Sequence, residues 1–199
     1  VWQGAGLPTP GFALIERAGD LAAAAELGFP LMVKPVREGS SIGMGRADDG
    51  AALRAAWQAA AAYDDQVLVE RWITGAEYTA AILGEVALPL IRLETPHAFY
   101  DFNAKYEADD TRYLIPCGLD AAREAELQDL ALRAFRAVGA AGWGRVDLLT
   151  DEEGGAWLIE VNTVPGMTGH SLVPMAAGAA GIDFDELVWR ILAQTVGRA

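Results

Sequence analysis

Cysteine is almost absent from this sequence, since Cys117 is the only one among 199 residues. A single cysteine excludes an internal disulfide and a metal cluster held by several cysteines. It is also compatible with a reducing compartment. We therefore expect the protein to be cytoplasmic.

Long apolar runs are missing too, so we expect no membrane-spanning segment, and the first residues do not resemble a signal peptide. Hydrophobic residues nevertheless make up 52% of the chain, and its mean hydropathy is +0.18. These values predict a folded globular protein, with length enough for one large domain or two small lobes. Because the sequence starts at Val1 rather than at Met, we expect a further N-terminal part.

Positive charge is scarce, with 15 Lys and Arg against 28 Asp and Glu and a net charge of −13. Such an acidic chain is a poor partner for nucleic acid or for an anionic membrane surface, and we expect it to bind neither. An anionic ligand would need local Lys and Arg side chains, helped by metal ions, to overcome the overall field.

Two short apolar segments, residues 144–149 and 157–162, predict a strand hairpin, because turn-forming residues separate them. Pairing Asp151 with Ala156 leaves a four-residue loop, which is an ordinary hairpin length. This register predicts a set of facing polar side chains: Asp147 opposite Glu160, and Arg145 opposite Asn162.

This polar set is unusual for apolar strands, because two facing carboxylates repel each other. A cation would relieve the repulsion, and oxygen ligands of this kind suit Mg²⁺ or Mn²⁺, with phosphates completing the coordination shell. Alternatively, Arg145 alone neutralises both carboxylates on a solvated sheet face. The spacing leaves both interpretations open.

Two glycine-rich loops are candidates for binding anions. Residues 37–45 follow a predicted strand that ends near Lys34, and their backbone N–H groups and serine hydroxyls are of the kind that cradle phosphate. They do not form a Walker A motif, so an ordinary loop is the alternative. Residues 163–172 precede a predicted helix and offer N–H groups for a carboxylate or an oxyanion. His170 is either a base there or a scaffold residue.

Two further segments have features of ligand contacts. Residues 70–73 follow a predicted strand and offer backbone groups to a flat heterocycle, unless they are only a charged edge followed by core residues. Residues 95–118 are long, polar and rich in aromatics. A segment of that kind is typical of a lid or binding loop, with disorder as the alternative.

The order of these signals resembles the ATP-grasp ligases, and more narrowly the D-alanine–D-alanine ligase family. The resemblance covers nearly all of the chain and rests on these motifs: Lys34-Pro35, residues 37–41, residues 99–102, Ala104-Lys105-Tyr106, residues 142–145, residues 160–168 and residues 170–174. Val164 and Gly169 depart from the pattern, since many members carry serine at both positions.

The resemblance implies an α+β ATP-grasp fold, in which two α/β lobes with mainly antiparallel sheets grip ATP between them. It places the small lobe, or central domain, at residues 1–75, the large lobe, or C-terminal domain, at residues 76–199, and a lid at residues 95–118. It also implies a preceding domain that supplies the subsite of the first D-alanine, and a homodimer of the full-length protein.

The resemblance also implies a set of ligand contacts. Eight of them bind ATP: Lys34 at the α- and β-phosphates, Ser40 and Ser41 over the triphosphate, Glu70 with the backbone of Arg71 and Ile73 at adenine, Glu77 at the ribose, and Lys105 at the γ-phosphate. Three side chains bind two Mg²⁺ or Mn²⁺ ions: Asp147, Glu160 as the bridging ligand, and Asn162.

The implied reaction joins two D-alanines into D-alanyl-D-alanine for peptidoglycan precursors, through an acyl phosphate made with ATP. Arg145 and the Gly166 N–H form the oxyanion site, a type of contribution worth about 3 kcal/mol per donor. Ser171 and the Leu172 backbone bind the carboxylate of the second D-alanine.

Tyr106 is associated in the family with D-alanine as second substrate, and a phenylalanine there with D-lactate. Two alternatives remain: a ligase that uses D-lactate or D-serine, and a non-catalytic fragment that binds Mg²⁺ and nucleotide.

Overall fold

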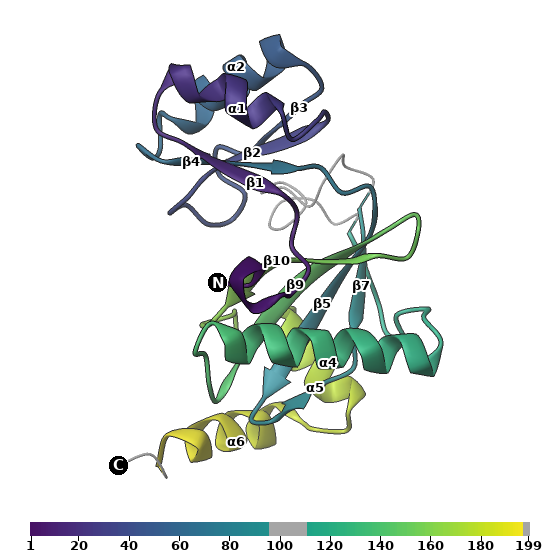
Figure 1. The fold of residues 1–199 in the computed structure, drawn as a ribbon. Coiled ribbons are helices and arrows are strands. Elements are labelled where there is room, and N and C mark those ends of the chain that lie inside the picture. Colours follow the sequence, from purple (N-terminus) through teal and green to yellow (C-terminus); the bar gives the residue numbers. More distant parts are fainter. Residues whose placement is uncertain (96–110, 197–199) are drawn as a thin grey trace. The chain divides into compact units, whose positions relative to one another are not determined.

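The computed structural model describes residues 1–95 and 111–196 (Figure 1). These residues form two compact units. Unit 1 contains Val1–Thr9, Thr74–Glu94 and the residues from Arg112 onward, and unit 2 contains Pro10–Ile73. Every strand pairing among the described residues is antiparallel, which confirms the expected α+β class. No helix in this described part is long and apolar enough to span a membrane.

Unit 2 is a four-stranded sheet in the order β1-β4-β2-β3 with two helices on one face. Its elements are β1 (Phe12–Ile15), the 3₁₀-helix η2 (Ala18–Asp20), α1 (Leu21–Ala25), β2 (Leu31–Pro35), β3 (Gly45–Ala47), α2 (Gly50–Ala60) and β4 (Val67–Arg71). Asp49 caps α2 by accepting the N–H groups of Ala51 and Ala52 at 2.9 and 2.8 Å. Because neighbouring strand residues face opposite ways, Val33 enters the core while Lys34 lies on the face without helices.

A buried carboxylate anchors the chain where it leaves β2. Asp64 accepts the Arg37 N–H at 2.7 Å, the Arg37 Nη1 at 2.6 Å and the Gln66 N–H at 3.1 Å. The bond from Gln66, followed by those from Arg37, holds the pKa of Asp64 below its usual value. The Gly/Ser loop therefore starts from a fixed point.

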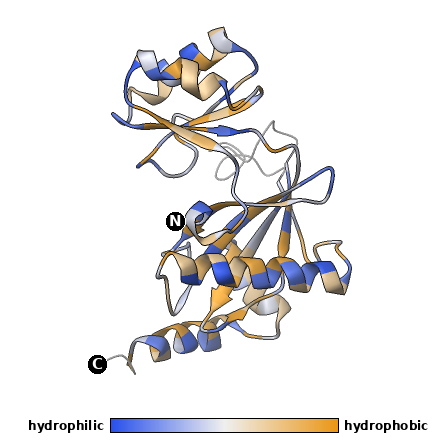
Figure 2. Cartoon of the chain, viewed as in Figure 1, coloured by the Kyte–Doolittle hydropathy of each residue, from blue (hydrophilic) through white to orange (hydrophobic). Residues whose placement is uncertain are grey.

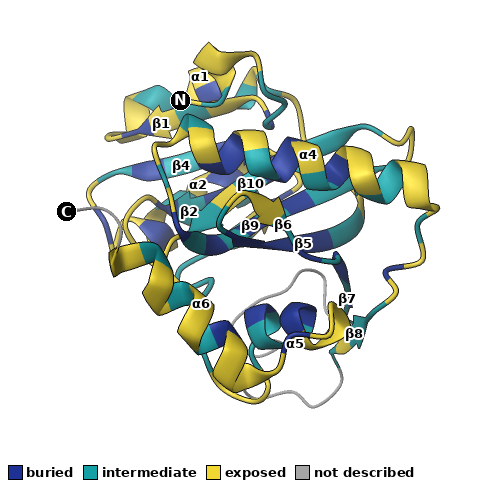
Figure 3. Ribbon diagram, turned by 90° about the horizontal axis from the view of Figure 1, so that it is seen from below, coloured by how far each residue is buried: buried dark blue, intermediate teal, exposed yellow. Residues whose placement is uncertain are grey.

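Unit 1 is a six-stranded sheet with the main order β10-β9-β5-β7-β8, in which β6 also pairs with β5. Its elements are the 3₁₀-helix η1 (Gln3–Ala5), β5 (Gly75–Leu83), β6 (Val86–Ala87), β7 (Ile91–Glu94), β8 (Arg112–Leu114), α4 (Ala121–Ala137), β9 (Trp143–Asp151), β10 (Ala156–Asn162), α5 (Leu172–Ala179) and α6 (Phe184–Val196). β5 and β9 are central strands, because each is paired on both sides. Figure 3 shows much of β5 as buried, and Figure 2 shows apolar and polar residues mixed along the strands of this sheet.

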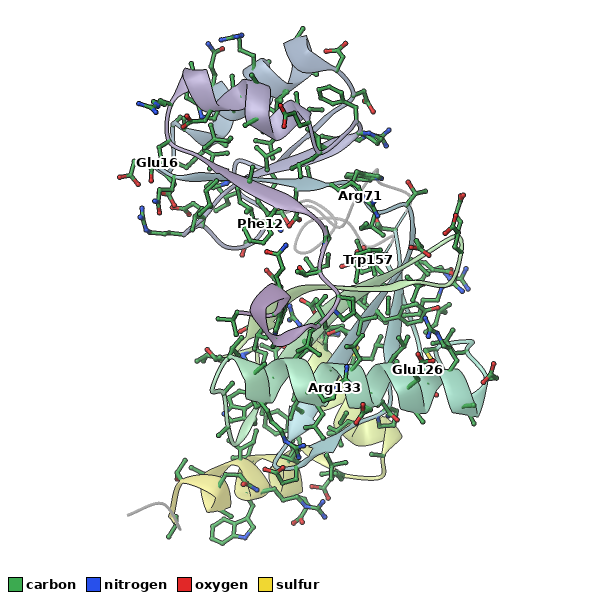
Figure 4. All side chains as sticks on the ribbon, viewed as in Figure 1. Phe12, Glu16, Arg71, Glu126, Arg133 and Trp157 are labelled. Atoms are coloured by element: carbon green, nitrogen blue, oxygen red, sulfur yellow. The ribbon has the colours of Figure 1, made fainter. Side chains whose placement is uncertain are left out.

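Helices cover the two faces of this sheet unequally. Leu127 and Phe135 of α4 pack with Val146 on one face, and Glu126 and Arg133 of α4 point outward (Figure 4). Val173 of α5 and Leu187 of α6 belong to a separate core that covers part of the other face. The rest of that second face carries the polar side chains described below.

The first nine residues pack within unit 1. The Trp2 indole donates to the Ala134 carbonyl at 2.9 Å, and Leu158 N–H donates to the Pro8 carbonyl at 2.9 Å. These contacts join segments distant in the sequence and place residues 1–9 in unit 1, and the two units divide after Ile73. The lobes at residues 1–75 and 76–199 stay a prediction.

We expect Asp64→Asn to lower the thermal unfolding midpoint more than Asp65→Asn. The Asp64 side chain is 3% exposed and accepts three donors, whereas the Asp65 side chain is 83% exposed and only pairs with Arg37. An amide nitrogen in place of one carboxylate oxygen cannot accept those donors. Equal losses in the two variants, measured by calorimetry at neutral pH, would contradict the anchoring role.

The stability difference between wild type and Asp64→Asn depends on pH. The folded pKa of Asp64 is depressed, so its contribution is complete above the unfolded pKa of about 3.9 and disappears as the pH falls through the lower folded value. The difference between wild type and Asp64→Asn should therefore shrink below about pH 4.

Candidate functional site

The β9–β10 hairpin brings together the predicted polar residues of unit 1. Asp147 pairs with Glu160 and Arg145 pairs with Asn162, as the sequence predicted. The predicted pairing near the turn is wrong, because Ala156 lies opposite Thr150 rather than Asp151. A register shift between Leu158 and Glu160 then restores the expected partners.

Asp151 is hydrogen-bonded to several residues of the hairpin turn. Its N–H donates to the Gly155 carbonyl at 2.8 Å, and its Oδ1 accepts the N–H groups of Gly155 and Glu153 at 2.6 and 3.1 Å. Oδ2 accepts the indole N–H of Trp157 at 2.7 Å (Figure 4). This carboxylate organises the turn locally, as Asp commonly does, and residues 151–155 lie between the paired Thr150 and Ala156.

Arg145 forms a two-pronged ion pair with Asp147. Its Nε lies 2.8 Å from Oδ1 and its Nη2 lies 2.6 Å from Oδ2. The same Nη2 is 3.8 Å from Oε1 of Glu160. Arg145 and Asp147 are 15% and 14% exposed, whereas Glu160 is 54% exposed. Arg145 therefore offsets the charge of both carboxylates, mainly that of Asp147.

Two neighbouring residues extend this polar face. The Asn162 Oδ1 accepts the Val164 N–H at 3.1 Å, which connects the end of β10 to the following loop. Glu77 lies on β5 with Leu149 as its pairing partner, two residues before Thr79 and on the same face. Thr79 donates its hydroxyl to Asp147 at 2.6 Å. Sequence reasoning missed this role of Thr79, since threonine is common in strands.

The donor chemistry of this face fits a hard divalent cation. Asp147, Glu160 and Asn162 provide two carboxylates and one amide oxygen, which are ligands of the type that Mg²⁺ and Mn²⁺ use. Within residues 1–95 and 111–196, no group of three or more His, Cys, Asp and Glu side chains is arranged to hold a metal. The set proposed from the sequence contains only two such residues, so phosphate or water oxygens would have to complete it.

The loop before α5 brings Gly166 close to Ser171. A Cβ on Gly166 would lie 2.9 Å from the Ser171 Oγ, so this approach requires glycine. The same Oγ accepts the Thr168 N–H at 2.9 Å and lies 2.9 Å from the Thr168 hydroxyl. Leu172 begins α5 and packs against its core. His170 is exposed, and its N–H donates to the Thr168 hydroxyl at 3.4 Å.

Unit 2 contains the other described residues of the predicted set. Lys34 Nζ lies 2.6 Å from Glu70 Oε1, and these side chains are 17% and 11% exposed. The Arg71 N–H donates to the Gly11 carbonyl at 2.9 Å, and Ile73 is buried. Lys34 was expected at the phosphates and Glu70 at adenine, but these two side chains are in direct contact.

The Gly/Ser loop of unit 2 has a backbone that few residues adopt. Ser40 and Ser41 have φ angles of +53° and +61°, in the left-handed region. Non-glycine residues in this region are concentrated at functional sites. Lys105 and Tyr106 of the predicted lid lie outside the described residues.

The sequence pattern of the family described as "D-ala D-ala ligase C-terminus" matches residues 1–193. The chain belongs to this family. It is 65% identical over 192 residues to the D-alanine–D-alanine ligase of Methylococcus capsulatus, covering 96% of this chain and 62% of that relative. This member of the D-ala D-ala ligase C-terminus family thus spans about three fifths of the length of the curated relatives it matches.

Two solved structures resemble the chain over 98% of its length. The VanG D-Ala:D-Ser ligase of Enterococcus faecalis is 31% identical with a TM-score of 0.86, and 59% of that chain is covered. The D-alanine–D-alanine ligase of Bacillus anthracis complexed with ATP is 26% identical with a TM-score of 0.82, and 62% of it is covered. These similarities confirm the predicted ATP-grasp fold class.

We expect the losses of unfolding free energy caused by substituting Lys34 and Glu70 to be strongly non-additive. Replacing either residue with alanine leaves a mostly buried partner without its ion pair, a change that costs about 1–3 kcal/mol or more for a charged group. Lys34→Ala combined with Glu70→Ala should therefore lose less stability than the sum of the two single changes. Urea unfolding of wild type, the two single variants and the double variant measures these losses. Additive losses would show that the Lys34–Glu70 contact contributes nothing.

Proposed function

We propose that this chain carries the ATP-grasp part of a D-alanine–D-alanine ligase, an ADP-forming enzyme that makes D-alanyl-D-alanine for peptidoglycan precursors. The observation that carries the proposal is the polar face in which Arg145, Asp147, Glu160 and Asn162 occupy paired positions on β9 and β10. Membership of the family supplies the reaction class that this arrangement supports. The two units would act as the two lobes of the fold.

Eight residues are assigned to the nucleotide. We assign Lys34 and the Ser40–Ser41 loop to the phosphates, and Glu70 with the backbone of Arg71 and Ile73 to adenine. Glu77 is assigned to the ribose, and Lys105 to the γ-phosphate. The ATP complex of the Bacillus anthracis ligase supports ATP as the co-substrate. Lys34 would have to share its charge between Glu70 and a phosphate.

Asp147, Glu160 and Asn162 would hold two Mg²⁺ or Mn²⁺ ions, with Glu160 as the bridging ligand. Such ions supply charge compensation for phosphoryl transfer. Arg145 is close enough to both carboxylates to limit their repulsion before a cation arrives. The more exposed Glu160 is the more accessible of the two ligands.

The chemistry proceeds in two stages. The carboxylate of one D-alanine takes the γ-phosphoryl group of ATP, giving an acyl phosphate and ADP. The amine of the second D-alanine then attacks the acyl carbon, and phosphate leaves. Arg145 and the Gly166 N–H would stabilise the tetrahedral oxyanion, and Ser171 with the Leu172 backbone would hold the second carboxylate.

Two other activities are consistent with the same face. The similarity to a D-Ala:D-Ser ligase keeps D-serine as an alternative second substrate, alongside D-lactate. Tyr106 is assigned to the second-substrate site and favours D-alanine. A non-catalytic fragment that binds Mg²⁺ and nucleotide is the alternative from a different class of function.

The remaining proposals concern the protein in the cell. We propose a cytoplasmic enzyme that acts as a homodimer in its full-length form, and that associates with neither nucleic acid nor membrane. The net charge of −13 supports the last two points, because polyanions and anionic lipids repel an acidic surface.

We expect the chain to release phosphate from Mg²⁺-ATP only when D-alanine is present, with a dipeptide product identified by mass. Glu160→Gln should abolish this release without unfolding the protein, because it removes the bridging carboxylate. Glu153→Gln is the matched control, since Glu153 is an exposed residue in the turn of the same hairpin.

The outcomes separate the candidate functions. Normal turnover by Glu160→Gln would refute the two-metal assignment. Nucleotide binding by calorimetry without any D-alanine-dependent release would favour the non-catalytic fragment. A mixed product that outweighs the D-alanine dipeptide when D-serine or D-lactate is added would favour the corresponding alternative ligase.

A further inference from the structure

Thr79 is a polar residue at a buried position of a central strand, where an apolar residue would be expected. It lies near the middle of β5 and is 2% exposed, between β7, where it pairs with Ile91, and β9, where it pairs with Asp147. Burying a hydroxyl costs free energy unless it finds a hydrogen-bond partner. Valine has nearly the same shape and would pack here without that cost.

The hydroxyl of Thr79 is used for a contact with Asp147. The distance from Oγ1 to Oδ1 is 2.6 Å, which is typical of a strong hydrogen bond from a hydroxyl to a carboxylate. Threonine is stiff about its first side-chain torsion because it is branched at Cβ. Its strand is paired on both sides, so the hydroxyl is a fixed donor.

Asp147 receives a second, different kind of donor from Arg145. The guanidinium contacts both carboxylate oxygens, at 2.8 and 2.6 Å, and also approaches Glu160. A long arginine side chain has several rotatable bonds and can exchange acceptors, whereas Thr79 cannot. If Arg145 turned toward another anion, Thr79 would still hold Oδ1, and Oδ2 would lose the donor that Arg145 gives it.

We propose that Thr79 is a positioning residue, which fixes the Asp147 carboxylate so that Oδ2 is available to a divalent cation while Arg145 serves the oxyanion. This inference rests on the proposed metal role of Asp147. It assigns to Thr79 the part that hydrogen-bond partners of ligating carboxylates play in metal sites, where their loss lowers metal affinity about 10- to 100-fold.

The test measures Mn²⁺ binding to the folded chain by electron paramagnetic resonance, with Mn²⁺ alone and with Mn²⁺ plus ADP. Thr79→Val should weaken binding by about tenfold or more, while Thr79→Ser, which keeps the hydroxyl, should remain within about threefold of wild type. Thr9→Val is the matched control, because the Thr9 hydroxyl donates to the Leu158 carbonyl at 3.0 Å in the same sheet and does not contact Asp147.

The outcomes distinguish this inference from the proposed function. Loss of Mn²⁺ binding in Asp147→Asn together with normal binding in Thr79→Val overturns the role of Thr79 and leaves the metal assignment intact. Normal binding in Asp147→Asn, or none in wild type, overturns both. Equal weakening in Thr79→Val and Thr79→Ser would show that only packing matters. If Thr79→Val does not fold, Thr79→Ala is measured against the same serine variant.

Discussion

The pairing of Asp147 with Arg145 is the interaction on which the polar face of unit 1 depends. Strand pairing places Asp147 opposite Glu160, and this arrangement alone would set two carboxylates against each other. Arg145, two residues earlier on the same strand and face, lies close enough to offset both charges. Arg145 thus offsets the charge of a face that presents oxygen atoms of the kind that a cation would use.

Unit 2 also pairs its cationic side chains with carboxylates. Lys34 is paired with Glu70, and Arg37 is paired with the buried Asp64, on either side of the point where β2 ends. Each cation is fixed by a carboxylate from the distant α2–β4 part of the unit. The Gly/Ser loop between these strands therefore starts from a rigid point, although its own Ser40 and Ser41 adopt uncommon backbone angles.

Local pattern accounted for what the sequence predicted correctly. Strand alternation and a turn between two apolar segments were enough to place Asp147 opposite Glu160. They failed at the turn itself, where Asp151 accepts backbone N–H groups of the turn and Ala156 pairs with Thr150 rather than with Asp151. The register shift before Glu160 compensated for that error, so the facing residues were right although the assumed loop was not.

Contacts between distant segments could not be predicted in this way. Lys34 and Glu70 are 36 residues apart, and Thr79 and Asp147 are 68 residues apart. Neither pair follows a period of the chain, and both depend on which strands become neighbours. The resemblance to a family supplied the candidate ligands, but it did not show that the candidate cations are already paired with carboxylates.

This pairing bears on how an acidic protein could accept the proposed polyphosphate ligand. With a net charge of −13, the chain repels anions at long range, so binding must depend on a few local cations. Lys34 and Arg145 are both less than one fifth exposed and paired, which means that much of their desolvation has already been completed during folding. An incoming phosphate or oxyanion then exchanges one anionic partner for another, instead of first removing a fully hydrated cation from water. In the proposed function, the carboxylate that Arg145 would release is Asp147, a proposed metal ligand. Cation pairing and metal binding would then be coupled steps of one charge balance on this face.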